Sequence, residues 1–509
     1  MADVASAMAR VMARAGKAHA RLLVVADQVH ARGRLLAWLG APLMTALLVG
    51  INQLVLLDFP NSGDEYVYLY QARTLAAGRL WNPAPPVADL FSFNYIAHDA
   101  GRAYGTFPPG WPLLLAAGIW IGLPAWVVNP LVGTLTLALV WRLGERLHGP
   151  RVAVLASGLV AVSPFFLFNA ASYFSHTLCG ALLLGAAVLA ARDDRRAAWV
   201  PLGVGALIGW AVVTRYLTGV VCGLPIVLWL IRPGVDRRRA IALVAAGGLP
   251  WALGLLAYNH ALTGDPFRLT TTPLTYSLWF RDGFLLRGAD ILATHLLRYL
   301  LWTPPTLVVA YVIALRHAPS SLRRGWLDWM PVLMAGVLYF YVERGGNQYG
   351  PRFHYEVFLF LVLAAAAWLV HQPAVARPAR RDRLVFVAMV ASVALMPVAL
   401  VIHADNEQDV IEERMDPFHA ARRSRLRNAL VLISGRVGTE RSMAAEDLTR
   451  NDIAHRAPVL FGRDLGVPGA CGPGESLPGR QTYLYRWDPA LDRGTLYPIA
   501  CGAGERAPR

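Results

Sequence analysis

The sequence contains almost no lysine. Lys17 is its only lysine, so 47 of its 48 basic side chains (48 − 1) are arginines, and the formal net charge is 48 − 33 = +15. The arginines cluster in short connections between apolar runs, where the topology of a membrane protein requires positive charge. The basic character therefore indicates no nucleic-acid partner.

Cysteine is also scarce, and no internal repeat is visible. Cys179 and Cys222 lie in apolar runs, whereas Cys471 and Cys501 lie in the polar C-terminal tail. Four cysteines are too few for a disulfide scaffold, although the two in the tail could pair in an oxidising compartment. The absence of a repeat disfavours a transporter built from inverted halves.

Long apolar runs dominate the rest of the chain, which is 56% hydrophobic with a mean hydropathy of +0.41. Runs of roughly 16–22 residues are typical of helices that cross a bilayer of about 30 Å. We therefore predict an all-α polytopic membrane protein of about 11 transmembrane helices. The spans are expected at 36–57, 126–147, 151–167, 174–191, 199–214, 217–231, 239–259, 290–314, 327–342, 355–371 and 384–402.

The arginine-rich connections predict the orientation of these spans. They lie at 142–151, 192–196, 232–239, 316–324 and 377–383. All five fall on the side of the N-terminus only if the apolar stretch 110–122 does not cross. This stretch is too short for a bilayer of about 30 Å. We predict that it lies in the outer interface, at the depth that suits Trp111 and Trp120.

Composition divides the chain into three parts. Residues 1–36 are a basic cytoplasmic N-terminus, and residues 37–402 form the transmembrane catalytic domain, whose first outer loop is 58–125. Residues 403–509 are expected to form a small extracytoplasmic α/β domain. Short β-like runs in that domain occur at 429–433, 458–461 and 482–485.

Two adjacent carboxylates, Asp64 and Glu65, follow the first span and begin a helix predicted over Glu65 to Ala77. Spacing of four and three residues places Asp64, Tyr68 and Gln71 on one polar face. The opposite face (Val67, Tyr70 and Leu75) is expected to rest on lipid. An ordinary alternative is that the carboxylates only stabilise the helix start, where the backbone dipole favours negative charge.

Five motifs follow one another along the chain. They are Gly63-Asp64-Glu65-x-x-Tyr68, Tyr104-x-x-Phe107-Pro108-Pro109-Gly110-Trp111-Pro112, Thr214-Arg215-Tyr216-Leu217-Thr218, Tyr258-Asn259-x-x-Leu262-Thr263-Gly264-Asp265-Pro266 and Tyr349-Gly350-Pro351-Arg352-Phe353-His354. Taken together and in this order, they resemble the GT-C superfamily of polytopic glycosyltransferases. The likeness covers roughly residues 40–370 and is to bacterial proteins related to protein O-mannosyltransferases and lipid A aminoarabinose transferase (family 39-like).

The resemblance implies transfer of a hexose or pentose from a polyprenyl-monophosphate donor to a hydroxyl of a glycan, lipid or protein. It implies the outer face of a bacterial cytoplasmic membrane, membrane lipids as further partners, and inversion at the sugar. The catalytic carboxylate maps onto Asp64, with Glu65 beside it. An aspartate is ordinarily a weak base at neutral pH, but a neighbouring carboxylate and removal from water strengthen it.

A phosphate leaving group also needs cations, and we expect Arg215 and Arg352 to supply them, because a guanidinium binds phosphate in a bidentate way. Arg215 could instead be a snorkelling side chain, and Arg352 could instead pair with Glu343. The other expected substrate-binding residues lie in the first loop or at outer ends of spans: Tyr68, Tyr104, His176, Tyr349 and His354.

Several alternatives stay open at this point. No His-x-x-x-His spacing predicts a metal site, so no ligand is assigned, and a divalent cation is left open. The aromatic segment 276–281 belongs either to a lipid-chain groove or to an ordinary aromatic belt. The main alternative function is a transporter or flippase of lipid-linked substrates, which would place charges or helix breaks in mid-membrane. A third interpretation is a structural or sensor protein, in which the C-terminal tail carries the function and the spans only anchor it in the membrane.

Overall fold

The computed structural model describes residues 18–270, 284–341, 348–371, 380–434, 436–437, 443–465, 477, 479–488, 490–491 and 493–499. The chain divides into two compact units, neither of which is continuous in sequence. The helical unit comprises Met1–Asn52, Trp126–Tyr258 and Thr272–His403. The sheet unit comprises Gln53–Ala125, Asn259–Thr271 and Ala404–Arg509, so it contains both the first outer loop and the tail.

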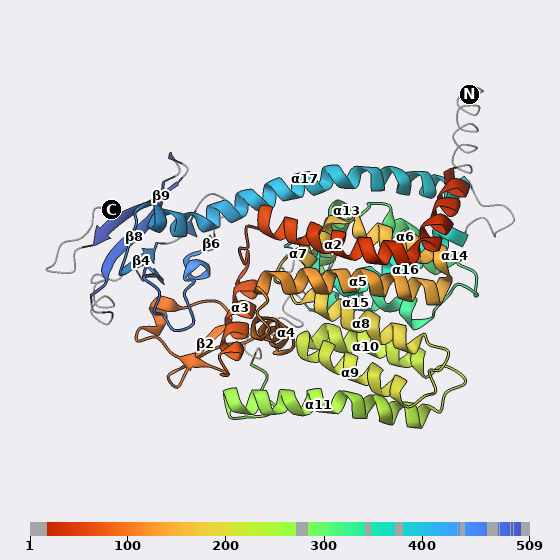
Figure 1. The fold of residues 1–509 in the computed structure, drawn as a ribbon, viewed down its shortest axis with the longest axis horizontal. Helices are drawn as coiled ribbons and strands as arrows, with labels where there is room; N and C mark the ends of the chain where they lie inside the picture. The colour runs from red at the N-terminus through yellow and green to blue at the C-terminus, as the bar shows by residue number, and fades with distance from the viewer. Residues whose placement is uncertain are drawn as a thin grey trace, which may run out of the picture. The chain divides into compact units, whose positions relative to one another are not determined.

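Every predicted span coincides with a helix or a helix pair (Figure 1). The neighbouring helices α8, α9 and α10 pack on one another, and α16 packs against α6, α8, α14 and α15. The helices are α2 (Gly33–Leu54), α5 (Ala125–His148), α6 (Pro150–Ala161), α7 (Pro164–Ala171), α8 (His176–Ala190), α9 (Trp199–Thr214), α10 (Tyr216–Leu230), α11 (Arg237–Thr263), α13 (Phe284–Trp302), α14 (Leu307–His317), α15 (Trp326–Phe340), α16 (Tyr355–His371) and α17 (Arg380–Arg423).

Two predicted spans are broken, which corrects the expectation of a single helix at each. α6 and α7 meet at 67°, and α13 and α14 meet at 111°. Proline explains both breaks, because Pro164 begins α7 and Pro304-Pro305 precede α14, and proline cannot continue a helix hydrogen-bond ladder. Neither break contains a charged residue.

The helices have the length and composition of a multi-pass membrane protein. Among the described residues, four helices are long and apolar enough to cross a membrane, or up to six if each bent pair is one span. Six shorter apolar helices of 10–17 residues accompany them. The count of about 11 spans stays a prediction.

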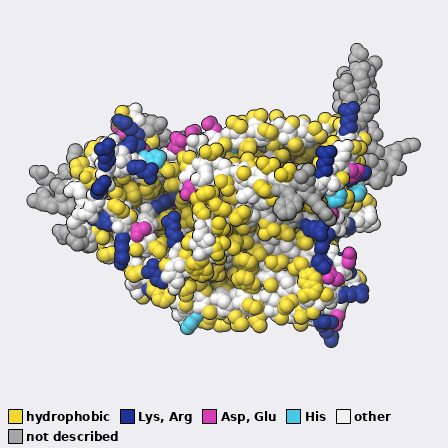
Figure 2. All heavy atoms as spheres, in the orientation of Figure 1, with side chains coloured by type: hydrophobic (Ala, Val, Ile, Leu, Met, Phe, Trp, Pro, Cys, Tyr) yellow, Lys and Arg dark blue, Asp and Glu magenta, His cyan; other side chains and the backbone are white. Residues whose placement is uncertain are grey.

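The predicted grouping of arginine-rich connections is confirmed for those that the structure describes. Arg146, Asp193, Arg232 and Arg323 come from four of these connections and line one common hollow. On the face drawn in Figure 2, hydrophobic side chains cover the helical unit and arginines gather at its end, at the right of the view. This separation is that of a membrane protein whose positive charge faces one side.

In the sheet unit, the first outer loop folds around a small antiparallel sheet of order β1-β3-β2. The strand β3 packs closely on α3 at Gly105, where an added Cβ would lie 2.4 Å from the Gln71 side chain. This close approach favours glycine at position 105. The elements of the loop are α3 (Gly63–Ala76), β1 (Asn82–Pro83), η1 (Ala88–Phe91), β2 (Ile96–Asp99), β3 (Arg102–Gly105) and α4 (Gly110–Trp120).

Two expectations about this loop are wrong. Val67 and Tyr70 do not rest on lipid, because Val67 packs with Phe93 and the Tyr70 hydroxyl donates to the Ala103 carbonyl of β3 at 3.2 Å. Trp111 is not interfacial either, since its side chain is fully buried, whereas Trp120 is 62% exposed. The short predicted helix itself is present as α4, which packs against α3.

The predicted C-terminal sheet domain is present, and all three β-like runs are strands. The sheet has the order β7-β4-β8-β9, with β4 parallel to β7 and β8 and with β9 antiparallel to β8 (Figure 1). One face packs on Ala420 and Ala421 of α17, and the other packs on Leu90 and Phe91 of the first loop. The strands are β4 (Ala429–Ile433), β5 (Arg436–Val437), β6 (Met443–Ala444), β7 (Val459–Arg463), β8 (Gln481–Asp488) and β9 (Arg493–Ile499).

Candidate active site

The predicted acid pair lies at the start of α3, where Ser62 caps the helix. Ser62 is the N-cap residue, and its hydroxyl oxygen accepts a hydrogen bond from the Glu65 backbone N–H at 3.2 Å. The same hydroxyl donates to the Glu65 carboxylate at 3.4 Å, and that side chain is only 1% exposed. Glu65 therefore stabilises the helix start, which is the ordinary alternative for this residue. Asp64 is half-buried beside it.

Tyr68 and Tyr104, the other predicted site residues of this unit, are largely buried, at 2% and 7% exposure. The Tyr68 ring lies 4.9 Å from the Phe107 ring, between centroids. Burial raises the pKa of Tyr104, which lies on β3. Gln71, one turn further along α3 than Tyr68, donates to the Phe107 carbonyl at 2.8 Å. The motif segment around Phe107 is thus fixed to the helix that carries Asp64.

The C-terminal tail also holds this helix, a contact that sequence reasoning missed. The Tyr66 hydroxyl donates to the Asn451 carbonyl at 2.8 Å and accepts from the Asn451 N–H at 3.0 Å. Arg450 lies over the rings of Phe59 and Tyr66, 4.2 Å and 5.6 Å from their centroids. Burial, followed by the charge of Arg414, lowers the pKa of Arg450 to about 9.

Replacing Tyr66 by phenylalanine is expected to loosen this attachment. It removes one hydroxyl that satisfies both backbone groups of Asn451, and leaving buried backbone groups unsatisfied costs about 1–3 kcal/mol. We expect a lower melting temperature and faster proteolysis between residues 53 and 125. Thr482→Val, a buried change on the tail strand β8, is the matched control and should leave proteolysis of the loop unchanged.

In the helical unit, Arg215 is the single residue between α9 and α10. Its backbone is extended (φ −148°, ψ 97°), so both helices stop at this residue and its side chain leaves the turn. This confirms the tight turn expected between two apolar runs. The guanidinium donates to the Ser175 hydroxyl oxygen at 3.1 Å, and the side chain is 18% exposed. Ser175 immediately precedes α8.

Glu356 is the central residue of this cluster, and sequence reasoning missed it. Its Oε1 lies 3.4 Å from Nε of Arg215 and 3.2 Å from Nδ1 of the predicted residue His176. The carboxylate is 0% exposed and His176 is 1% exposed. A signal did exist, because Glu356 is the only acidic residue in the apolar run 355–371, and an ionisable group in a membrane span marks a functional site.

Arg352 lies near Arg215 and contacts aromatic rings of the same cluster. Its guanidinium lies 4.2 Å from the Phe174 ring centroid and 5.9 Å from that of Phe353. The Arg215 guanidinium lies 5.9 Å from the same Phe353 ring. Tyr349, fully buried, packs on Phe174 with centroids 5.7 Å apart. The structure thus brings together Arg215, Arg352, His176 and Tyr349 from motifs far apart in sequence.

His354 does not join this cluster. It lies 3.2 Å, between ring nitrogens, from His295 of α13, and its carbonyl accepts from the Tyr299 hydroxyl at 3.1 Å. The role of His354 in substrate binding stays a prediction. Across the described residues, no group of three or more His, Cys, Asp or Glu side chains could hold a metal ion. Glu343, Cys471, Cys501 and 276–281 lie outside the described residues.

The cluster around Glu356 is suited to an anion. The N-termini of three helices lie at this cluster. Helix α8 starts at His176, α10 starts directly after Arg215, and Glu356 is the second residue of α16. Helix N-termini present N–H groups and positive dipole ends to a negative ligand. The guanidiniums of Arg215 and Arg352 add full positive charges beside these N-termini. The geometry therefore suits a negatively charged ligand such as a phosphate.

Comparison with known proteins identifies the fold. A family model described as dolichyl-phosphate-mannose-protein mannosyltransferase matches residues 108–261. No curated protein matches the sequence. ArnT from Cupriavidus metallidurans bound to undecaprenyl phosphate aligns with a TM-score of 0.54 at 15% identity, covering 94% of this chain and 100% of that one. Apo ArnT aligns at 0.55 and 13%, covering 91% and 94%. The chain has the ArnT-like GT-C fold, and its resemblance to the GT-C glycosyltransferases related to protein mannosyltransferases is confirmed.

Proposed function

We propose that the protein is a glycosyltransferase that moves a sugar from a polyprenyl-monophosphate donor to an acceptor hydroxyl at the outer face of a bacterial cytoplasmic membrane. The observation that carries the proposal is the pair Arg215 and Arg352 beside three helix N-termini. That arrangement is suited to a lipid phosphate at the end of membrane spans. It occurs in a fold whose relative ArnT binds undecaprenyl phosphate.

In the proposed reaction, the acceptor hydroxyl gives its proton to the Asp64 carboxylate. The acceptor oxygen forms a bond to the anomeric carbon from the face opposite the phosphate, while the bond from that carbon to the phosphate oxygen breaks. The phosphate keeps the electron pair, and Arg215 and Arg352 stabilise its added negative charge. A single displacement of this kind inverts the anomeric configuration.

We assign Glu356 as a positioning residue for Arg215, because their side chains lie 3.4 Å apart and the carboxylate is fully buried. We assign the tail the role of holding α3, since Tyr66 of that helix and Phe59, which precedes it, contact Asn451 and Arg450. Glu65 supports Asp64 through its two hydrogen bonds with the capping residue Ser62. The proposed acceptor is a glycan, lipid or protein, and membrane lipids surround the spans.

The two helix breaks are the observation that supports the transporter alternative. A transporter is expected to coordinate its substrate at the break with charged or unwound groups. The breaks here consist of Val162-Ser163 and Thr303-Pro304-Pro305-Thr306, with no charge. The charged cluster lies instead where helices begin, at His176, Arg215 and Glu356.

Mass spectrometry of envelope glycans and glycolipids tests the proposal. In a deletion strain we expect one glycosylated product to disappear and the polyprenyl-phosphate sugar that serves as its donor to accumulate. The wild-type gene should restore the product, whereas a gene encoding Arg215→Gln should not. Unchanged glycans, or a glycoconjugate that is complete but retained on the wrong face, would contradict a transferase and favour the transporter.

A further inference from the structure

A hollow at the arginine-rich end of the helical unit has no part in the proposed reaction. It has a volume of about 620 Å³ and is lined by Arg146, Arg232, Arg323 and Arg324. Arg146 lies in the last turn of α5, Arg232 follows α10, and the other two precede α15. Asp193, between α8 and α9, is the only acidic residue in the lining. Separate connections therefore converge on one basic hollow.

In the part of the chain that the structure describes, none of these four guanidiniums forms an ion pair with a carboxylate, although the Arg324 backbone N–H donates to Asp328. Neighbouring arginines do, because Arg142 pairs with Glu145 at 2.7 Å and Arg192 pairs with Asp194 at 2.6 Å. The four in the hollow donate instead to backbone carbonyls of Val188, Trp229, Ala190, Ala318, Ser321, Arg323 and Leu147. Neutral carbonyls fix the guanidiniums, and nearby carboxylates, Asp193 and Asp194 beside Arg146 and Asp328 beside Arg324, offset their charge only in part.

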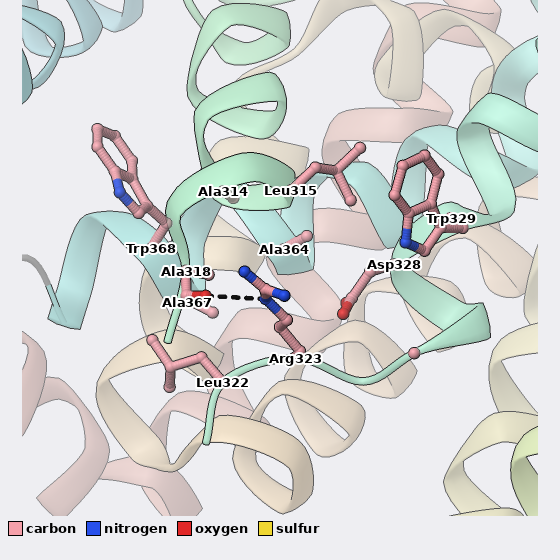
Figure 3. Close-up of a pocket in the computed structure, with 11 residues that line it drawn as sticks. Ala314, Leu315, Ala318, Leu322, Arg323, Asp328, Trp329, Ala364, Ala367 and Trp368 are labelled. Carbon is pink, nitrogen blue, oxygen red and sulfur yellow. Dashed lines mark hydrogen bonds between the residues drawn. The ribbon is translucent and has the colours of Figure 1, made fainter. Parts of the chain in front are cut away.

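The local electrostatics agree with this geometry. The pKa of Arg232 is lowered to about 10, chiefly by burial and then by the positive charges of Arg195 and Arg324. Figure 3 draws an adjoining pocket that shares Arg323 with the hollow; there the Arg323 side chain donates to the Ala318 carbonyl, and Asp328 lies on its other side. Counting both Asp193 and Asp328 against the four arginines still leaves two positive charges (4 − 2). A bound anion would offset them.

Aromatic residues at the hollow indicate that it opens at the membrane surface. The Arg232 guanidinium lies 3.8 Å from the Trp229 ring centroid, and Trp326, also in the lining, is 56% exposed. Tryptophan is enriched at the depth of lipid headgroups. Arginines that only set topology would be expected to lie exposed in separate loops, whereas Arg146, Arg232 and Arg324 are half-buried together.

We propose that this hollow binds the phosphate headgroup of an anionic membrane lipid on the arginine-rich side of the protein. The guanidiniums would contact the phosphate oxygens, and Trp229 and Trp326 would lie beside the glycerol and upper acyl chains. Basic pockets between transmembrane helices are suited to anionic headgroups. The site is independent of the sugar-transfer cluster at Glu356.

Native mass spectrometry of the full-length protein tests this site by titration with phosphatidylglycerol, cardiolipin or phosphatidylcholine. Each near-surface arginine contributes about 1 kcal/mol to anionic-lipid binding, so Arg232→Gln or Arg323→Gln should weaken phosphatidylglycerol binding by about fivefold. The double variant should lose about 25-fold. Arg238→Gln, an exposed arginine outside the lining, is the charge-matched control and should change nothing.

Three results would overturn the proposal. Equal losses in Arg238→Gln and Arg232→Gln would mean that net charge alone attracts the lipid. Equal binding of phosphatidylcholine and phosphatidylglycerol would mean that the site does not select an anionic headgroup. Displacement of the lipid by inorganic phosphate at equal concentration would assign the site to a free phosphate. Arg323→Gln keeps the test valid if Arg232→Gln does not fold, because the Arg323 side chain is exposed at the rim.

Discussion

Asp64→Asn is expected to lower sugar transfer by about 10²- to 10⁴-fold, the usual contribution of a general base, while the protein still inserts and folds. Asparagine has nearly the same shape as aspartate and is tolerated in the first turn of a helix. Losing the carboxylate there costs only about 0.3–1 kcal/mol of dipole stabilisation. The measurement is transfer from a polyprenyl-phosphate sugar in membranes, normalised to the amount of inserted protein.

Glu65→Gln is the matched control, because it also removes one carboxylate from the same turn. The glutamine side chain can still accept from the Ser62 hydroxyl, and the backbone N–H of residue 65 still donates to it, so helix α3 should begin at the same residue. We expect a much smaller loss of transfer than in Asp64→Asn. Full activity of Asp64→Asn would remove Asp64 as the base. Equal losses in both variants would assign the effect to the helix start instead.

The sequence predicts the helical part of the fold well, because long apolar runs mark the segments that cross a membrane and arginines mark the connections between them. Each expected span is present as a helix or a bent pair. Proline breaks such as Pro304-Pro305 were visible in the sequence. The bend of 111° was not predictable, since its size depends on how α13 and α14 pack after the break.

The side-chain environment of the site was less predictable, because distant segments create it. Val67 and Tyr70 look lipid-facing on an isolated helix, yet the first-loop sheet covers them. Arg450 comes from a tail that shows no catalytic motif, yet its guanidinium lies against Phe59. Motif order identified Arg215 and Arg352, but no spacing rule places a carboxylate 141 residues away (356 − 215) beside Arg215.

Arg215→Gln is expected to lower transfer by about 10²- to 10³-fold, the usual loss when one stabilising donor of a transition state is removed. The phosphate leaving group gains negative charge only as its bond to the sugar breaks, so kcat should fall more than KM for the donor rises. Glu356→Gln should also lower transfer, through Arg215. Steady-state kinetics of the purified protein with donor and acceptor varied separately measure both quantities.

Stability distinguishes the role of Glu356 from that of Arg215. Removing Glu356 alone leaves a mostly buried guanidinium, only 18% exposed, without its carboxylate, and breaking one side of a buried pair costs about 3–5 kcal/mol. Arg215→Gln with Glu356→Gln removes both charges, so the double variant should melt at a higher temperature than Glu356→Gln alone. Its transfer activity should nevertheless stay as low as that of Arg215→Gln. Recovery of activity in the double variant would mean that Arg215 does not act on the phosphate. If the double variant melts no higher than Glu356→Gln, the two side chains are not a coupled pair, and Glu356 does not position Arg215.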